Sequence, residues 1–174
     1  MNNKLLKEFS GKNLFPLGLI FLMVFSRLIP HPPNFTPIIA VAIMSGYFFK
    51  KIHISFIVLI VSMLLTDFIL GFYKNMIFIY LSLFFIILLF FNRKIEGKNL
   101  IFYSFAGSLL FYLVTNFAVW LFGDMYEKNL SGLIYCYYMA IPFFTKTIIS
   151  TIFFSYAAFF LCHLAAYLFL LSFS

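Results

Sequence analysis

The sequence predicts an all-α membrane protein with about six transmembrane helices and a proline-rich break between the first two. Hydrophobic residues make up 64% of the 174 residues and charged residues only 10%, which leaves too little polar surface to cover a water-soluble particle. The apolar residues also form repeated stretches near the length of roughly 20 residues that crosses a ~30 Å hydrocarbon core. We therefore expect a single integral membrane domain over residues 1–174.

Six segments meet or approach this length requirement. They cover residues 14–30, 35–50, 52–73, 75–92, 99–123 and 141–172. Between the last two segments, residues 127–140 mix Lys, Asn, Ser and Gly with Tyr and Leu. This composition suits an interfacial loop or a short helix.

The break between the first two segments is the stretch Arg27-Leu-Ile-Pro-His-Pro-Pro-Asn-Phe-Thr-Pro37. Proline lacks a backbone donor and restricts the residue before it, so this stretch cannot be helical throughout. Lipid does not satisfy exposed backbone groups, so we expect it to line protein or a water-filled cavity. His31 and Asn34 are therefore candidate ligand contacts, although a histidine in a loop is more often a structural residue that makes a hydrogen bond.

The third segment contains a carboxylate, Asp67, within an otherwise apolar run. A charge at the bilayer centre costs about 2.5–3.5 kcal/mol on insertion scales, so it needs a partner, a proton or a cavity. Arg27 at the end of the first segment is the natural partner. We expect these two residues to pair across helices or to contact a substrate.

The fifth segment carries polar residues at intervals of four, which places them on one helical face. They are Ser108, Tyr112, Asn116, Trp120 and Asp124. Such a stripe serves either interhelical contacts or a pocket, and Trp120 also suits an interfacial anchor. An amide and an indole one turn apart match a small planar or cyclic ligand, so we expect Asn116 and Trp120 to line a cavity with the proline-rich stretch.

The sixth segment is preceded by Tyr135-Cys136-Tyr137-Tyr138. These tyrosines fit an aromatic belt, and Tyr137 is also a candidate wall of the site. Lys146 follows Pro142 by one turn, near an expected helix start where the dipole disfavours a cation. We therefore expect Asp124 or an anionic ligand beside Lys146.

The distribution of Lys and Arg predicts the orientation of the chain. A cytoplasmic N-terminus places Lys4, Lys7, Lys12, Lys50, Lys51, Arg93, Lys94 and Lys98 inside, against Arg27, Lys74, Lys128 and Lys146 outside. Both termini are then cytoplasmic, and all the polar features above gather at the outer face. The basic residues form small groups rather than a stripe, which argues against nucleic acid as a partner.

The predicted substrate-binding residues share this outer position. They are Arg27, His31, Asn34, Asp67, Asn116, Trp120, Asp124, Tyr137 and Lys146. We predict no catalytic residue, metal or cofactor, because Cys136 and Cys162 make no paired motif and the carboxylates and histidines are scattered singly.

Three stretches resemble the signature of a family of small bacterial six-helix membrane proteins of uncharacterised function. They are residues 27–37, Thr115-Asn116-Phe-Ala-Val-Trp120 and Gly132-Leu-Ile-Tyr-Cys-Tyr-Tyr-Met-Ala-Ile-Pro-Phe-Phe144. This family is distantly similar to the S-components of energy-coupling factor (ECF) vitamin transporters. The resemblance implies the bacterial inner membrane, capture of a vitamin- or cofactor-like molecule from outside, and an ATPase-containing energising module as partner. S-components commonly dock through Ala-x-x-x-Ala in the first helix, whereas the nearest such pattern here is Ala42-Ile-Met-Ser-Gly46 in the second.

These observations predict a membrane solute-binding and transport protein. The sequence has no Walker A or HExxH motif, so any ATP use would come from partner subunits. One alternative is an intramembrane enzyme acting on a lipid or isoprenoid, with Asp67, Asp124 and His31 as acid/base or metal groups. Another is a noncatalytic accessory subunit whose polar face contacts protein. The scattering of these groups favours a protein that is not an enzyme.

Overall fold

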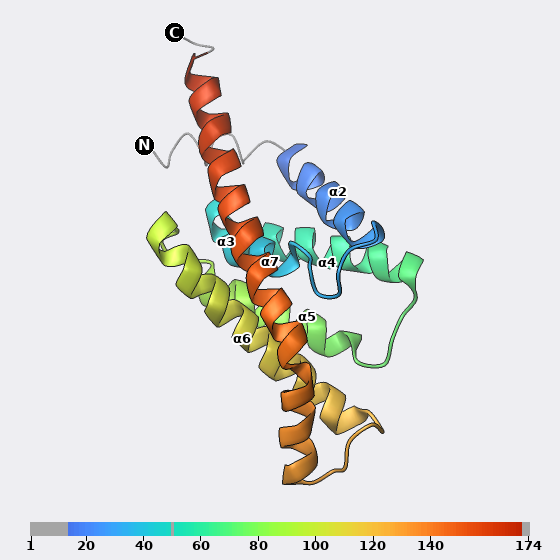
Figure 1. Cartoon of the computed structure of the whole chain (residues 1–174). Coiled ribbons are helices and arrows are strands. Elements are labelled where there is room, and N and C mark those ends of the chain that lie inside the picture. Colours follow the sequence, from blue (N-terminus) through green and yellow to red (C-terminus); the bar gives the residue numbers. More distant parts are fainter. Residues whose placement is uncertain (1–13, 50, 172–174) are drawn as a thin grey trace.

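The computed structural model describes residues 14–49 and 51–171, which form helices joined by short connections (Figure 1). In chain order the helices are α2 (Leu14–Leu28), α3 (Ile38–Phe48), α4 (Ile52–Leu70), α5 (Met76–Phe90), α6 (Gly97–Phe122) and α7 (Leu130–Leu171). They correspond to the six predicted segments, and the break between α2 and α3 falls on the proline-rich stretch. The all-α class is confirmed.

The start of α7 differs from the prediction, because the helix begins at Leu130 and continues through Pro142. The stretch 127–140 is therefore mostly the first part of α7 rather than a separate loop or short helix. Asn129 sets this start, since its side-chain Oδ1 accepts the backbone N–H of Gly132 at 2.8 Å, as an N-cap does. At 42 residues, α7 is roughly 60 Å long, about twice the thickness of a ~30 Å hydrocarbon core.

Helix α3 lies at the centre of the molecule, where it contacts α4, α5, α6 and α7. Every residue from 38 to 45 is buried, which is possible because no side of this helix is polar. A Cβ added at Gly46 would lie 1.8 Å from the carbonyl oxygen of Phe91. Gly46 thus permits close backbone contact with the end of α5, and the Ala42–Gly46 pattern serves internal packing.

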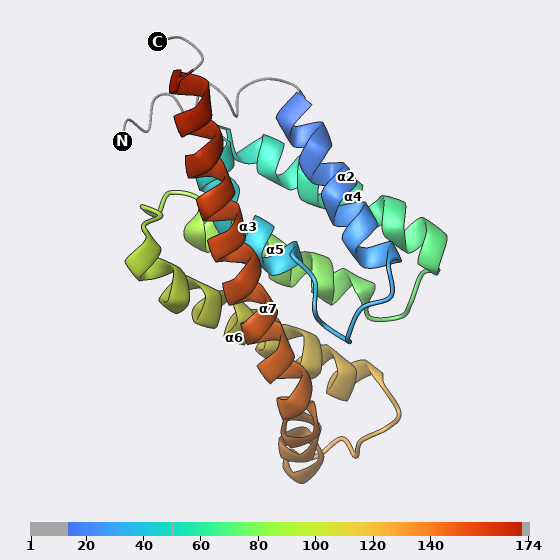
Figure 2. The ribbon, with the colours of Figure 1, turned by 45° about the horizontal axis from the view of Figure 1, so that its top comes forward.

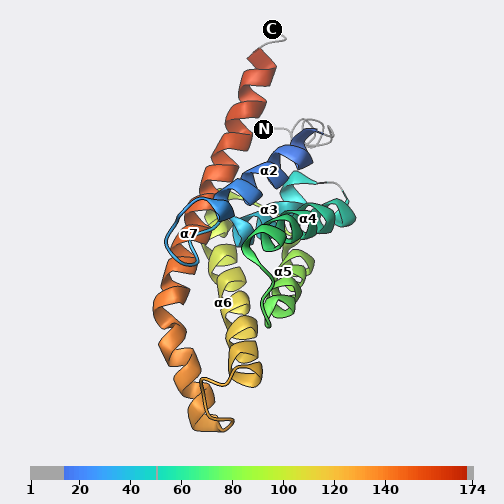
Figure 3. The ribbon, with the colours of Figure 1, turned by 90° about the vertical axis from the view of Figure 1, so that its right-hand side faces the viewer.

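Four of the other helices form two pairs around α3, and α5 packs on both α3 and α6. Helix α2 packs on α4, and α6 packs along α7. Figures 1 and 3 show α4 lying across the direction of α7, with the start of α2 and the end of α7 toward one end of the molecule. The connection between α6 and α7 lies at the opposite end, beyond the other helices (Figure 2).

Three helices are long and apolar enough to cross a membrane, namely α4, α6 and residues 130–164 of α7. Helices α3 and α5, and residues 18–28 of α2, are apolar but shorter. Large apolar side chains are strongly exposed, including Phe21 at 70% and Phe68 at 80%, whereas a soluble monomer rarely exposes extensive apolar patches. These features indicate a membrane protein.

Candidate functional site

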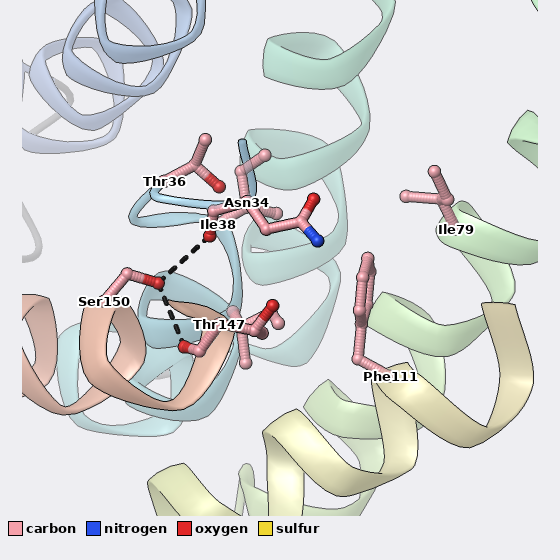
Figure 4. Close-up of a pocket in the computed structure, with 8 residues that line it drawn as sticks. Asn34, Thr36, Ile38, Ile79, Phe111, Thr147 and Ser150 are labelled. Carbon is pink, nitrogen blue, oxygen red and sulfur yellow. Dashed lines mark hydrogen bonds between the residues drawn. The ribbon is translucent and has the colours of Figure 1, made fainter. Parts of the chain in front are cut away.

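Two adjoining cavities lie between the α2–α3 loop, α5, α6 and α7 (Figure 4). The larger has a volume of about 190 Å³ and is lined by Asn34, Ile79, Phe111, Tyr112, Thr115, Asn116, Ala140, Phe143, Phe144 and Thr147. The smaller has a volume of about 50 Å³ and is lined by Asn34, Thr36, Ile38, Ile39, Ile79, Phe111, Thr147 and Ser150. The four residues common to both show that the two cavities meet.

A tight turn in the proline-rich loop positions Asn34. The carbonyl of Pro32 accepts the backbone N–H of Phe35 at 3.0 Å, and Asn34 has a φ of +64°. Proline at the second position of such a turn and asparagine with positive φ at the third are the features of a type II turn. Figure 4 shows the Asn34 amide pointing into the space beside Phe111 and Ile79.

Side chains of α7 hold this loop in place. The Ser150 hydroxyl lies 3.2 Å from the carbonyl oxygen of Asn34 and 3.0 Å from that of Thr147, and its hydrogen can be donated to either (Figure 4). The ring of Phe35 packs on Phe153 and Phe154, with centroid distances of 6.2 and 5.6 Å. These contacts hold the end of the loop against α7, whereas residues 29–34 remain exposed, so the expected shielding of the whole stretch by protein is not seen.

Three polar side chains that line the larger cavity donate hydrogen bonds to backbone carbonyls of their own helices, α6 or α7. Thr115 Oγ1 donates to the carbonyl of Phe111 at 2.8 Å, and Thr147 Oγ1 donates to that of Phe143 at 2.9 Å. Asn116 Nδ2 donates to the carbonyl of Tyr112 at 2.8 Å. The two hydroxyl oxygens and the Asn116 carbonyl oxygen retain lone pairs that can accept hydrogen bonds from a ligand.

Two tyrosines clamp α6 and α7 together beside the larger cavity. Tyr112 Oη donates to the carbonyl of Tyr137 at 2.6 Å, and Tyr137 Oη donates to the carbonyl of Leu113 at 2.8 Å. Pro142 lies in the same part of α7 and has no N–H for the carbonyl four residues before it. The cavity therefore lies beside the part of α7 in which one helical backbone hydrogen bond is missing.

Pairs of hydroxyl groups join α6 to α7 on the side of the cavity away from Tyr137. Ser108 Oγ lies 3.2 Å from Thr151 Oγ1, and Ser104 Oγ lies 3.4 Å from Ser155 Oγ. All four side chains are buried. These pairs form a polar stripe that continues from Thr147 toward the start of α6.

Arg27 and Asp67 form an ion pair outside these cavities, which confirms the predicted partnership. Arg27 Nη2 lies 2.8 Å from Asp67 Oδ1, and Arg27 Nη1 also contacts the Thr66 hydroxyl. Tyr80 Oη donates to Asp67 Oδ2 at 2.7 Å. The completely buried carboxylate thereby joins α2, α4 and α5, a structural role that accounts for both charges.

The other predicted site residues are placed as follows. Trp120 Nε1 donates to the carbonyl of Glu127 at 2.9 Å, and Tyr137 holds α6, as described above. His31 is exposed, with Nδ1 2.9 Å from the carbonyl oxygen of Pro32. Asp124 and Lys146 are exposed. Of the predicted residues, Asn34 and Asn116 line the two cavities.

The prediction of an acidic neighbour for Lys146 assumed that this residue lies near the start of a helix, and that assumption was wrong. Lys146 lies far inside α7 rather than near a helix start, so the helix dipole makes no special demand there. No ion pair joins Lys146 to Asp124 within the described residues, where the ion pairs are Arg27–Asp67, Lys94–Glu96 and Lys98–Glu96.

In the α5–α6 connection, hydrogen bonding and charge from Lys94 and Lys98 lower the pKa of Glu96.

Sequence reasoning missed Thr115 and Thr147 as lining residues. Thr115 directly precedes Asn116, and Thr147 lies five residues after Pro142. Their closeness to these two residues was the signal in the sequence that could have identified them.

Within residues 14–49 and 51–171, no group of three His, Cys, Asp or Glu side chains is placed to hold a metal ion. The arrangement offers hydrogen bonds and aromatic surface rather than charge.

No curated protein and no solved structure matches the chain, so these comparisons give no support to the resemblance to S-components. The family comparison gives a match over nearly the whole sequence. The chain belongs to a family of unknown function, DUF6580, whose model matches residues 7–170.

Proposed function

We propose that this protein is a membrane solute-binding protein that takes a small molecule into the larger cavity and helps to move it across the membrane. The observation that carries this proposal is the cavity of about 190 Å³ that brings polar groups from separate elements together. Asn34 comes from the loop, Asn116 from α6 and Thr147 from α7. Sites of this kind have mostly apolar walls and a few convergent polar groups.

The position of the cavity supports a role in transport. Backbone that departs from regular helix inside a membrane is tolerated where it lines a cavity, and transporters use such breaks to build substrate sites. Here the cavity lies against the non-helical α2–α3 loop and the part of α7 around Pro142. Asn34 is exposed, so the solute would enter at this loop.

The direction of movement and the energy source are also proposals. The Lys/Arg distribution places the loop at the outer face of a six-span bundle in the bacterial inner membrane, so solute would be captured from outside. By analogy with S-components, the solute is a vitamin- or cofactor-like molecule, and an ATPase-containing module supplies the energy. This analogy rests on size, helix number and the outward-facing site.

The alternative functions receive less support from the geometry. An intramembrane enzyme would use Asp67, Asp124 and His31, but none of these residues lines either cavity. Asp67 is also held by Arg27 and Tyr80. An accessory subunit would not need a cavity that gathers polar groups from the loop, α6 and α7.

Mass spectrometry of small molecules that co-purify with the protein tests the proposal. We expect a solute to be retained by the wild-type protein and lost from Asn116→Leu, because Leu packs well among helices but cannot hydrogen-bond. Asn99→Leu is the matched control, since Asn99 lies on the same helix and does not line either cavity. Equal retention by wild type and Asn116→Leu, or no retained solute in either, would contradict the proposal.

A further inference from the structure

We infer, on the basis of the proposed function, that the solute is an uncharged flat ring bearing a hydrogen-bond-donating group such as a carboxamide. Three properties of the walls of the two cavities support this inference. They lack charge, they present mainly hydrogen-bond acceptors, and they include several aromatic rings.

The lack of charge excludes ionic solutes. No Arg, Lys, His, Asp or Glu is among the residues that line either cavity. An ion that enters such a site loses its hydration without gaining an opposite charge, which is strongly unfavourable. A carboxylate or an ammonium group would therefore be rejected in favour of a neutral group of the same shape.

The hydrogen-bond pattern requires a solute that donates. The hydroxyl hydrogens of Thr115 and Thr147 are already given to helix carbonyls. Asn116 Nδ2 uses one of its hydrogens in the same way, so these three side chains chiefly offer oxygen lone pairs. An N–H or O–H group on the solute would satisfy them, whereas a methyl group would leave them unpaired.

Asn34 adds both a donor and an acceptor at the loop side of the cavity. Its amide makes no hydrogen bond within the described part of the chain, because Ser150 contacts only its backbone carbonyl. Figure 4 shows this amide directed between Phe111 and Ile79. A carboxamide on the solute could pair with it through both its N–H and its C=O groups.

The size and the aromatic walls favour a single ring. A cavity of about 150 Å³ holds one benzene molecule, so about 190 Å³ accommodates a ring with one small substituent. Phe111, Phe143 and Phe144 line this cavity, and Tyr112 stacks on Phe144 with ring centroids 4.5 Å apart. A flat ring would pack against these faces.

Three probes of nearly identical shape test the inference on the purified full-length protein. Benzamide has the donor and no charge, benzoate replaces the amide by an anion, and acetophenone replaces the NH₂ by CH₃. Dissociation constants from ligand-observed NMR should show benzamide binding at least roughly tenfold more tightly than either analogue, because both analogues leave the acceptors on the cavity wall without a donor.

Variants of Asn34 assign the binding to this cavity. Asn34→Gly keeps the backbone conformation, because glycine tolerates positive φ, but removes the amide. We expect roughly tenfold weaker benzamide binding and a smaller loss of acetophenone binding, because acetophenone can only accept a hydrogen bond from the Asn34 amide. Asn92→Gly is the control, since Asn92 is exposed in the α5–α6 connection and lines neither cavity. Asn34→Asp, which keeps the shape but loses the donor hydrogens, should weaken benzamide binding as well.

Several results would overturn the inference. They are benzoate or acetophenone binding as tightly as benzamide, no saturable benzamide binding, and benzamide binding that is insensitive to both Asn34 variants. The co-purification experiment distinguishes this failure from that of the proposed function. An anionic solute retained by the wild type and lost from Asn116→Leu would refute the solute class while supporting solute binding.

Discussion

At the scale of single residues, Arg27 and Asp67 form the one buried ion pair within residues 14–49 and 51–171. The Asp67 side chain is 0% exposed and that of Arg27 is 13% exposed, so each would be costly without the other. Removing one partner of a buried ion pair costs about 3–5 kcal/mol, because the remaining charge is left uncompensated. Removing a single hydroxyl donor costs about 1 kcal/mol or somewhat more when its acceptor is charged.

These magnitudes give a prediction for folding in detergent. Asp67→Leu should lower the free energy of unfolding by about 3 kcal/mol or more, and Tyr80→Phe by about 1–2 kcal/mol. Charge reversal of Arg27 or Asp67 alone should reduce the amount of folded protein, and the double swap should recover part of it. Fluorescence-detected size-exclusion chromatography and thermal unfolding measure both effects. Independent, additive losses in the double swap would show that the two residues are not partners.

At the scale of helices, α6 and α7 are held by hydroxyl pairs whose spacing leads directly to the cavity. The pairs Ser104–Ser155 and Ser108–Thr151 advance by four residues along each antiparallel helix. The next pair in this register would be Tyr112–Thr147, but each of these hydroxyls donates to a backbone carbonyl instead. The cavity thus begins where the pairing of side chains between the helices stops.

Features that depend on local sequence could be predicted, whereas features that depend on the packing of helices could not. Helix positions follow from the length of apolar segments, and the Arg27–Asp67 pair follows from the cost of isolated charges. Asn34 was identifiable because prolines interrupt the helix around it. The role of Thr147 depends on the register between α6 and α7, which no local pattern specifies. The early start of α7 depends on one Asn129 cap within a stretch of mixed composition.

Trp120 illustrates why the regular stripe on α6 was only partly informative. Residues spaced by four drift around a helix that has 3.6 residues per turn, so the stripe leaves the face that meets the cavity. Asn116 lines the cavity, whereas Trp120 one turn later is hydrogen-bonded to the α6–α7 connection through Glu127. Asp124 lies beyond the end of α6.

At the scale of the whole molecule, the helices are not a set of parallel spans. Helix α4 lies across α7 (Figures 1 and 3), and only α4, α6 and α7 have the length and composition to cross a membrane. The proposed six-span arrangement therefore requires α2, α3 and α5 to contribute short spans. The charge distribution still predicts that the α5–α6 and α6–α7 connections lie on opposite sides.

Reporter fusions test this topology. A reporter that is active only in the cytoplasm should give a signal at Gly97 and none at Lys128, because α6 lies between these positions. A reporter that is active only outside should give the reverse pattern. Equal cytoplasmic signals at both positions would exclude the six-span orientation.

The accessibility of the cavity tests the central claim, that the space beside Asn34, Asn116 and Thr147 receives a solute. The measurement is the rate at which methyl methanethiosulfonate, a small neutral thiol reagent, modifies Thr147→Cys and Ser155→Cys in a Cys136→Ser, Cys162→Ser background. Thr147 lines both cavities, whereas Ser155 is buried in its hydroxyl pair with Ser104, the pair farther from the cavities. We predict rapid modification at position 147 and little at position 155. Equal rates at the two positions, or no reaction at position 147, would contradict the account.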